Sequence, residues 1–434
     1  MRQFVAYLRK VIRLPRMAEK ILHDSRRSPK YSTSTCVLLP ILMLVMRIRS
    51  FNLFEPRLDD KPMKKLFGGL PIPKCVDTIA NTLKKIDIDS LRTLHEETLK
   101  VANKNKVLRN SFHQGLRMFC FDGFEPIRSR KRSCKGCLTA TYKTDDGEVT
   151  DYFHRFVVMY SIGFKPDLIL GVEPQKSSTQ LKYKDSEAEK AQGELTAVKP
   201  LIDRLRNLFP KIFDVGIGDA LYPNGPMINF MKNNNPPYDL IAVLKKENNE
   251  PMADAIKLYD KLDPTKIYYD RKRGEHVRLW DTQGFEALES SDHPLRVIKA
   301  QVHKGPKSLK PQNIDWDREN IGVWWIATTI SQKKLSGPNL IDSQRRRWNG
   351  ENVQSQLTLH WYVKHSYVHH HVATTAMMYI FMIAFNLFQL FLCRCLRNFE
   401  DRFSSSLEVV EQMKLDYAHI NDPRDGLFSN IDFG

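Results

Sequence analysis

The sequence of 434 residues predicts an α/β fold, in which helices flank a mixed sheet, with a helical N-terminal region and a β-rich insertion. Two observations carry this prediction. From about residue 115, runs with strand periodicity alternate with runs of helical spacing, which is typical of an α/β layer. Residues 265–310 then hold short strand-like pieces separated by Gly, Asp and Pro, which indicates the insertion.

The N-terminal region, residues 1–112, is predicted to be helical because basic and apolar residues are interleaved along it. Arg9, Lys10 and Arg13 are followed by the apolar run 38–46, which is too short to cross a bilayer as a helix. The region is expected to be either a DNA-binding module or a helical cap on the next domain, and both interpretations stay open.

The core is predicted in two parts, residues 113–250 and 319–396, on either side of the insertion at 251–318. Its first strand should end at a turn formed by Asp122 and Gly123. A crossover helix then leads to a buried strand that ends at Gly218-Asp219. Strands are expected at 116–121, 138–143, 152–162, 167–172, 212–217 and 240–244, and helices at 186–209 and 226–231.

The later elements are a strand at 323–329, a helix from 341 to about 360 and a helix at 372–396, and residues 397–434 are predicted to be a polar, peripheral tail. The apolar run 372–393 is long enough to span a bilayer. Because polar residues such as Asn386 interrupt it, we expect a buried helix and no membrane partner, with a membrane anchor as the alternative.

The composition points to a polyanionic partner. Lys and Arg number 67 against 50 Asp and Glu, which leaves a formal net charge of +17. Each cation set against a phosphate releases a condensed counterion, so nucleic acid is favoured over a basic surface that only aids solubility. The seven cysteines are an odd number in a long chain, which argues against a secreted disulfide framework and favours an intracellular setting.

Three carboxylates fall where the predicted elements would bring them together. Asp122 and Asp219 each follow a strand of the core, and Glu351 lies on the late helix. Ligands of open α/β sheets gather at the carboxyl ends of strands, so one crevice can hold both aspartates. Hard cations such as Mg²⁺ prefer oxygen ligands, and a pair of such ions supports phosphoryl transfer. The sequence therefore predicts a magnesium site, in which Mn²⁺ can substitute.

Three segments together resemble the DDE transposases of bacterial insertion sequences, in particular the insertion-sequence-four group. The segments are Phe121-Asp122-Gly123-Phe124-Glu125 with the Cys134–Cys137 pair, Asp214-Val215-Gly216-Ile217-Gly218-Asp219-Ala220-Leu221-Tyr222, and Arg345-Arg346-Arg347-Trp348-Asn349-Gly350-Glu351-Asn352. The resemblance covers about residues 30–396, and the long gap between Asp219 and Glu351 leaves room for the β-rich insertion of such enzymes.

The resemblance implies an RNase H-like catalytic domain in which Asp122, Asp219 and Glu351 are catalytic and bind the metal. It implies an endonuclease of a mobile element that recognises terminal inverted repeats and assembles as a synaptic dimer. Such an enzyme cuts each end, often through a DNA hairpin, and joins the freed 3′-hydroxyl to target DNA. The implied location is the bacterial cytoplasm, at the nucleoid.

The candidate DNA-binding residues are Arg345, Arg346, Arg347 and Lys364. Arg347 lies one helical turn before Glu351 and can hold a phosphate with both arms of its guanidinium, whereas a solvated basic run is the alternative. The family's motif has Tyr where this chain has Gln344 and Lys where it has Thr358. A catalytically inactive, transposase-derived DNA-binding protein is therefore the second hypothesis.

Other candidates have simpler interpretations. Cys134 and Cys137 have the spacing of zinc ligands, and Cys120 or His154 can complete a site, but one such pair is half a motif and ordinary thiols are favoured. His365 and His369 would share a helical face, although polar packing or contact with DNA is favoured for the histidines at 360–371. Glu194 can support the metal site, but a solvated helix face is the simpler expectation.

Overall fold

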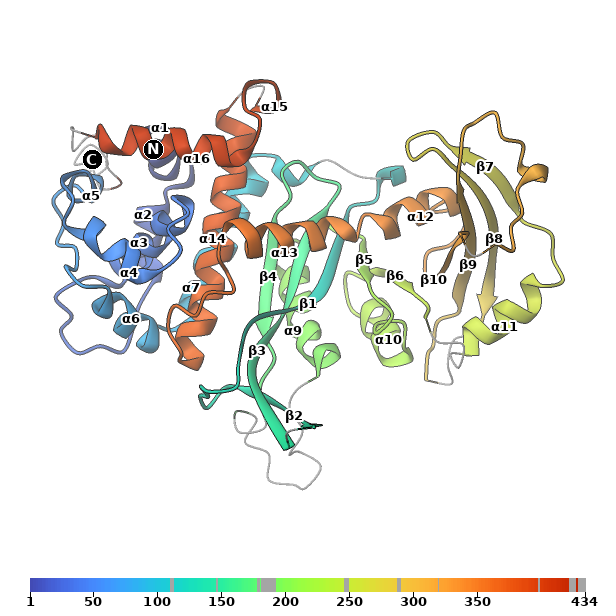
Figure 1. The fold of residues 1–434 in the computed structure, drawn as a ribbon, viewed down its shortest axis with the longest axis horizontal. Coiled ribbons are helices and arrows are strands. Elements are labelled where there is room, and N and C mark those ends of the chain that lie inside the picture. The colour runs from blue at the N-terminus through green and yellow to red at the C-terminus, as the bar shows by residue number, and fades with distance from the viewer. Residues whose placement is uncertain are drawn as a thin grey trace.

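In the computed structural model, one mixed sheet of ten strands runs through the molecule with helices on both sides (Figure 1). The structure describes residues 1–434 except 110–112, 146, 178–179, 181–192, 246–249, 287–289, 319, 397–398, 421–426 and 428–434. The strand order is β2-β3-β1-β5-β6-β10-β9-β8-β7, and β4 pairs with β3. The predicted α/β class with a mixed sheet flanked by helices is confirmed.

The strands are β1 (Met118–Ser129), β2 (Leu138–Thr144), β3 (Gly147–Ile162), β4 (Ile169–Pro174), β5 (Val215–Gly218), β6 (Asp239–Val243), β7 (Lys266–Asp270), β8 (Glu275–Phe285), β9 (Leu295–Lys304) and β10 (Gly322–Thr328). The helices of the core and the C-terminal part are α9 (Glu194–Leu208), α10 (Gly225–Asn233), α11 (Glu250–Tyr259), α12 (Gly337–Arg345), α13 (Trp348–His360), α14 (His371–Cys395), α15 (Phe399–Arg402) and α16 (Ser406–Ala418). Residues 186–192 of the expected crossover helix lie outside the described residues.

The N-terminal part is helical and packs around α14 at one end of the sheet (Figure 1). Its helices are α1 (Arg2–Tyr7), α2 (Leu14–Ile21), α3 (Thr33–Val45), α4 (Phe51–Phe54), α5 (Lys61–Leu66), α6 (Val76–Lys85) and α7 (Ile88–Lys104). Helix α3 begins where Ser32 accepts a hydrogen bond from the Thr35 N–H, which satisfies a donor of its first turn. The helices α3, α6 and α7 all contact α14.

Helix α14 is long and apolar enough to cross a membrane, yet 89% of its most apolar window is buried inside the structure. The polar residue in its middle explains this position. The Asn386 side chain accepts a hydrogen bond from the Ile169 N–H and donates one to the Ile169 carbonyl, both at 2.8 Å. An amide that pairs with a strand in this way is suited to a protein core, where buried polar groups need partners.

The centre of the sheet is parallel. Strand β5 pairs in parallel with both β1 and β6, whereas β3 pairs with β1 in the antiparallel direction. Strand β1 does not end at Asp122 and Gly123 as predicted, but continues to Ser129 against β3. The predicted turn at Asp122 and Gly123 is wrong, because Gly123 is part of the strand and pairs with Val157 of β3. The local sequence does not reveal this distant partner.

The strands of the insertion extend the same sheet beyond β10. Strands β9, β8 and β7 follow β10 in antiparallel order, and α11 packs on β8 and β9. At the base of this part, the Arg296 guanidinium contacts both carboxylate oxygens of Asp281 at 2.7 and 2.6 Å. Arg296 also donates a hydrogen bond of 2.7 Å to the Leu335 carbonyl, which holds the segment before α12 against β9.

The single helix expected from residue 341 to about 360 is two helices, α12 and α13, which cross the sheet one after the other toward α14 (Figure 1). The break falls at Arg346 and Arg347, within the basic run. Helix α13 lies against β1 and β3. It comes close because Gly350 has no Cβ: a Cβ there would be 2.9 Å from the Cys120 sulfur and 3.0 Å from the Tyr160 ring.

The C-terminal segment is not the peripheral tail that its polarity suggested. Helix α16 begins at a Ser405 cap and buries Val409, Val410, Met413 and Tyr417. It contacts α1, and Asp416 accepts a hydrogen bond from the Arg2 N–H at 2.7 Å. The prediction failed because the apolar residues of α16 form one narrow stripe within a polar composition.

Candidate functional site

Asp122, Asp219 and Glu351 lie on elements that meet at the carboxyl end of β5. Strand β5 ends at Gly218, so Asp219 directly follows it, as expected. Cys120 of β1 pairs with Ile217 of β5 in a parallel ladder. Asp122 and Asp219 each come two residues later in the sequence, so they lie at the same height along the two neighbouring strands. Glu351 is in the first turn of α13, which contacts β1.

The guanidinium of Arg347 joins two of these carboxylates. Its Nη1 donates to Asp122 Oδ2 at 3.1 Å, and its Nη2 donates to Glu351 Oε1. Arg347 and Glu351 are one helical turn apart, so both face the middle of β1, where Asp122 lies. The side chain of Arg347 is only 15% exposed, so this residue does not belong to a solvated basic run.

A fourth carboxylate, Glu194, belongs to the same cluster. Its side chain is 8% exposed, accepts a hydrogen bond from the Tyr222 hydroxyl at 2.6 Å and pairs with Arg155 at 3.2 Å. It lies so near β1 that a Cβ on Gly123 would be 2.5 Å from its Oε2. The prediction that Glu194 lies on a solvated helix face is therefore wrong, because the first residue of α9 points toward Tyr222 and Gly123.

Burial, together with the neighbouring negative charges, raises the pKa of Asp122. Burial raises the pKa of its carboxyl to about 6, and the neighbouring charges of Asp219 and Glu194 add to this, whereas Arg347 acts in the opposite direction. The ionised form of Asp122 is thus less favourable here than in water. A bound cation would relieve this repulsion.

We expect Asp122→Asn to stabilise the protein at pH 8 in the presence of a chelator. Because the pKa of the folded state, about 6, exceeds the ordinary value of 3.8, the folded state binds the proton more tightly. The associated stability is lost as pH rises from about 4 to 6, and up to about 3 kcal/mol is missing above that range. Thermal unfolding at pH 5 and pH 8 measures this, with the exposed Asp317→Asn as control. An unchanged melting temperature of Asp122→Asn at pH 8 would contradict it.

The ligand atoms that this site offers are of the type that hard divalent cations prefer. Asp122, Asp219 and Glu351 offer carboxylate oxygens, which are the ligands that Mg²⁺ prefers. Among the described residues, their oxygens do not form a group within 4.8 Å of one another, since Arg347 lies between two of them. The guanidinium thus supplies the positive charge that holds Asp122 and Glu351 in this arrangement.

The other basic candidates divide into different environments. Arg345 is 10% exposed, pairs with Glu275 at 2.6 Å and lies over the Trp324 ring, so its side chain is held within the protein. Arg346 lies 3.7 Å from Asp342. Lys364 lines an open groove beside the acidic cluster, together with Gly123, Glu125, Glu351 and Thr358.

Gln344 is buried and donates a weak hydrogen bond of 3.4 Å to the Gly218 carbonyl, next to Asp219. This residue therefore supports the end of β5 and does not line the groove. Of the remaining candidates, His365 and His369 are not on a helix, so the expectation that they share a helical face is wrong. Cys120 of β1 is buried against Gly350 of α13. It does not belong to the group formed by Cys134 and Cys137.

The comparisons with known proteins find distant similarity among solved structures only. No family model matches the chain, and no curated protein matches its sequence. Among solved structures, the chain is similar to a piggyBac transposase in a synaptic complex with hairpin DNA, with a TM-score of 0.40 and 10% sequence identity. The alignment covers 96% of this chain and 80% of that chain. At this level the similarity concerns only the path of the chain.

Proposed function

We propose that this chain is a metal-dependent DNA transposase of the DDE type, with an RNase H-like core of the insertion-sequence-four kind. The observation that carries the proposal is the arrangement of Asp122, Asp219 and Glu351 around the end of β5, with Arg347 between two of them. These are the residues at which the sequence resembles that family. The formal charge of +17 suits a polyanionic substrate.

In this proposal Asp122, Asp219 and Glu351 hold a pair of Mg²⁺ or Mn²⁺ ions. When bound, such a pair activates the attacking oxygen and stabilises the leaving oxygen of a phosphodiester. Glu194, which Tyr222 and Arg155 hold in place, adds a fourth negative charge beside Asp122 and so strengthens the attraction of the site for cations. Lys364 lines the groove, and Arg347 lies beside it between Asp122 and Glu351. In the proposal both cations neutralise the DNA phosphates, which positions the strand for in-line attack.

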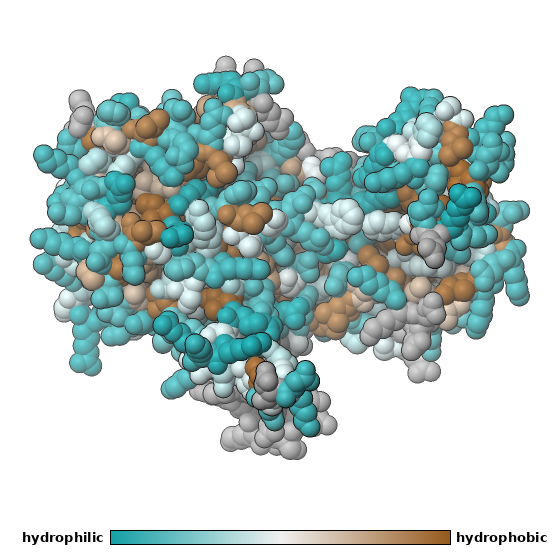
Figure 2. Space-filling view, viewed as in Figure 1, coloured by the Kyte–Doolittle hydropathy of each residue, from teal (hydrophilic) through white to brown (hydrophobic). Residues whose placement is uncertain are grey.

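A DNA-binding protein without catalysis is the second candidate, and one observation favours it. Gln344 is buried and Thr358 is neutral, so neither supplies the DNA contact that the family's Tyr and Lys make at these positions. Both candidates share the basic surface, and Figure 2 shows that the viewed face is largely hydrophilic. They differ in whether a divalent cation leads to cleavage.

The test uses a supercoiled plasmid that carries the DNA flanking the reading frame. The purified chain should convert it to nicked or linear DNA with Mg²⁺ or Mn²⁺, and not with a chelator. The ends should carry 3′-hydroxyls, which a polymerase can extend. Gel-shift binding without cleavage in either metal supports the second candidate, and the absence of both binding and cleavage refutes both.

We expect Gly350→Ala to reduce cleavage far more than it reduces stability. The new Cβ would meet the Cys120 sulfur at 2.9 Å and push α13, with Glu351, away from the aspartates. A displacement of about 1 Å at a reacting centre can cost about 100-fold in rate. The higher helix propensity of Ala offsets part of the packing cost, by about 1 kcal/mol.

Cleavage rates and melting temperatures of Gly350→Ala and of Cys120→Ala/Gly350→Ala measure this effect. The second variant removes the sulfur and should recover part of the activity. Wild-type cleavage by Gly350→Ala would show that the close approach of α13 does not position Glu351.

A further inference from the structure

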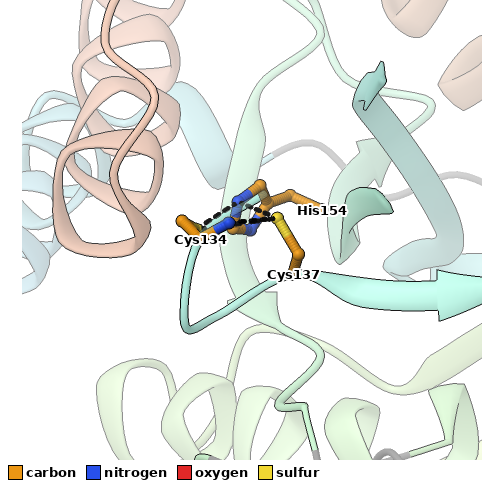
Figure 3. Close-up of side chains that lie close together, drawn as sticks. All are labelled: Cys134, Cys137 and His154. Carbon is orange, nitrogen blue, oxygen red and sulfur yellow. Dashed lines mark hydrogen bonds between the residues drawn. The ribbon is translucent and has the colours of Figure 1, made fainter. Parts of the chain in front are cut away.

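Two cysteines and a histidine form a compact cluster away from the carboxylates (Figure 3). The Cys134 and Cys137 sulfurs are 3.6 Å apart, and His154 Nε2 lies 3.3 and 3.5 Å from them. Within the part of the chain that the structure describes, this is the one group of three such side chains with metal-ligand spacing. The sequence favoured ordinary thiols for this pair, with Cys120 or His154 able to complete a site, and the structure places His154, but not Cys120, in the cluster.

The spacing matches a tetrahedral zinc ion. Ligand atoms about 2.1 to 2.3 Å from a common zinc, at tetrahedral angles, lie roughly 3.4 to 3.8 Å apart. The observed separations of 3.5 and 3.6 Å fall within this range, and the third, 3.3 Å, is just below it. A disulfide requires sulfurs about 2.05 Å apart, so the cysteines are not bonded to each other.

The local backbone presents both sulfurs on one side. Cys134 and Cys137 lie in the turn between β1 and β2, where the Cys137 N–H donates to the Cys134 carbonyl and the Cys134 N–H donates to the Cys137 sulfur at 3.3 Å. His154 points to this turn from β3, where it pairs with Ile127 of β1. Amide donors to a sulfur stabilise its thiolate form, which is the form that binds metal.

A second histidine, His369, lies beside the cluster but outside the group whose ligand atoms are within 4.8 Å of one another. The rings of His369 and His154 have centroids 6.4 Å apart. His369 Nε2 is enclosed and has no hydrogen-bond partner within the described part of the chain. A buried ring nitrogen without a partner needs an explanation, and a metal ion supplies one. The start of α14 is held close, because a Cβ on Gly136 would be 2.5 Å from the His371 Cβ.

We propose that Cys134, Cys137, His154 and His369 bind a structural zinc ion. Two thiolates balance the charge of Zn²⁺, so the complex is neutral and suits a buried position. With four protein ligands no open position remains for a substrate, which separates this site from the acidic cluster. The ion joins the β1–β2 turn and β3 to the start of α14, and thereby ties the sheet to the helical N-terminal part.

Metal analysis of the purified full-length chain tests the proposal. Protein prepared without chelators should contain about one zinc per chain, and Cys134→Ser/Cys137→Ser should contain almost none. The matched control is Cys393→Ser/Cys395→Ser, which removes two exposed cysteines and should keep the zinc. His369→Ala should lose zinc to a chelator at concentrations that leave His370→Ala loaded.

Cobalt substitution makes the test independent of the folding of the variants. Wild-type protein reloaded with Co²⁺ should show intense visible bands of tetrahedral cobalt and a near-ultraviolet band of thiolate-to-cobalt charge transfer. Circular dichroism of the zinc-free protein should show a lower melting temperature, restored by Zn²⁺ and not by Mg²⁺. A reduced wild-type chain that binds neither Zn²⁺ nor Co²⁺ overturns the site, and loss of zinc from His370→Ala in place of His369→Ala overturns the choice of fourth ligand.

Discussion

Asp122→Ala is expected to abolish metal-dependent cleavage, with a loss of roughly 10³-fold or more in rate. Groups that act directly on a transferring phosphoryl group contribute effects of this size. Asp219→Ala and Glu351→Gln should have similar effects, because under our proposal each removes a carboxylate ligand that the other two cannot replace. The rate of plasmid nicking at saturating Mg²⁺ is the measurement.

DNA binding separates a catalytic role from a structural one. Gel-shift affinity of the three variants should stay close to that of the wild type, since the removed groups are negative and do not attract phosphate. Asp317→Asn changes an exposed carboxylate outside the cluster and should cleave normally. If one of the three variants still cuts DNA at the wild-type rate, that residue does not belong to the catalytic set.

Arg296→Ala is expected to destabilise the fold by about 3–5 kcal/mol, the usual cost of breaking a buried ion pair. Arg296 is 2% exposed and Asp281 is 8% exposed, so the substitution leaves a buried carboxylate without its partner. It also leaves the carbonyls of Ile330 and Leu335 without their donor. Urea unfolding followed by circular dichroism measures the loss.

Two further variants define the mechanism of this loss. Arg296→Met/Asp281→Leu removes both charges and should cost less than Arg296→Ala alone, because no buried charge remains. Arg318 forms a surface pair with Asp315 at 3.0 Å, and Arg318→Ala should cost less than about 1 kcal/mol. Equal costs for Arg296→Ala and Arg318→Ala would mean that burial of the Asp281 pair has no energetic role.

The sequence predicted those parts of the fold that depend on local periodicity. The strand before Asp219 was found because a short apolar run followed by polar turn residues marks it. The helical segment around Glu351 was also predicted, but the break that separates α12 from α13 was missed. Strand β1 was cut short because its second half is stabilised by pairing with β3, and Asp122-Gly123 has the composition of a turn. Long-range pairing of this kind leaves no trace in a short window of sequence.

The candidate site shows the same division. Arg345, Arg346 and Arg347 are adjacent and read as one basic run, but Arg345 pairs with Glu275 while Arg347 lies between Asp122 and Glu351. Their partners come from distant segments, so only the fold separates their roles. The helix break between α12 and α13 gives them different directions, and local propensity does not mark it.

Helix α13, which carries Glu351, has few buried residues, and this makes the proposed catalytic centre separable from the rest of the fold. Asp122 lies on β1 and Asp219 directly follows β5, so both are held by the middle of the sheet. Glu351 is on α13, whose buried residues are Gly350, Val353 and Leu357. Few apolar contacts mean a low free energy of local opening. Amide hydrogens of α13 should therefore exchange well before those of β5, so a partner that loosens this one helix would disrupt the proposed catalytic centre while leaving the sheet folded.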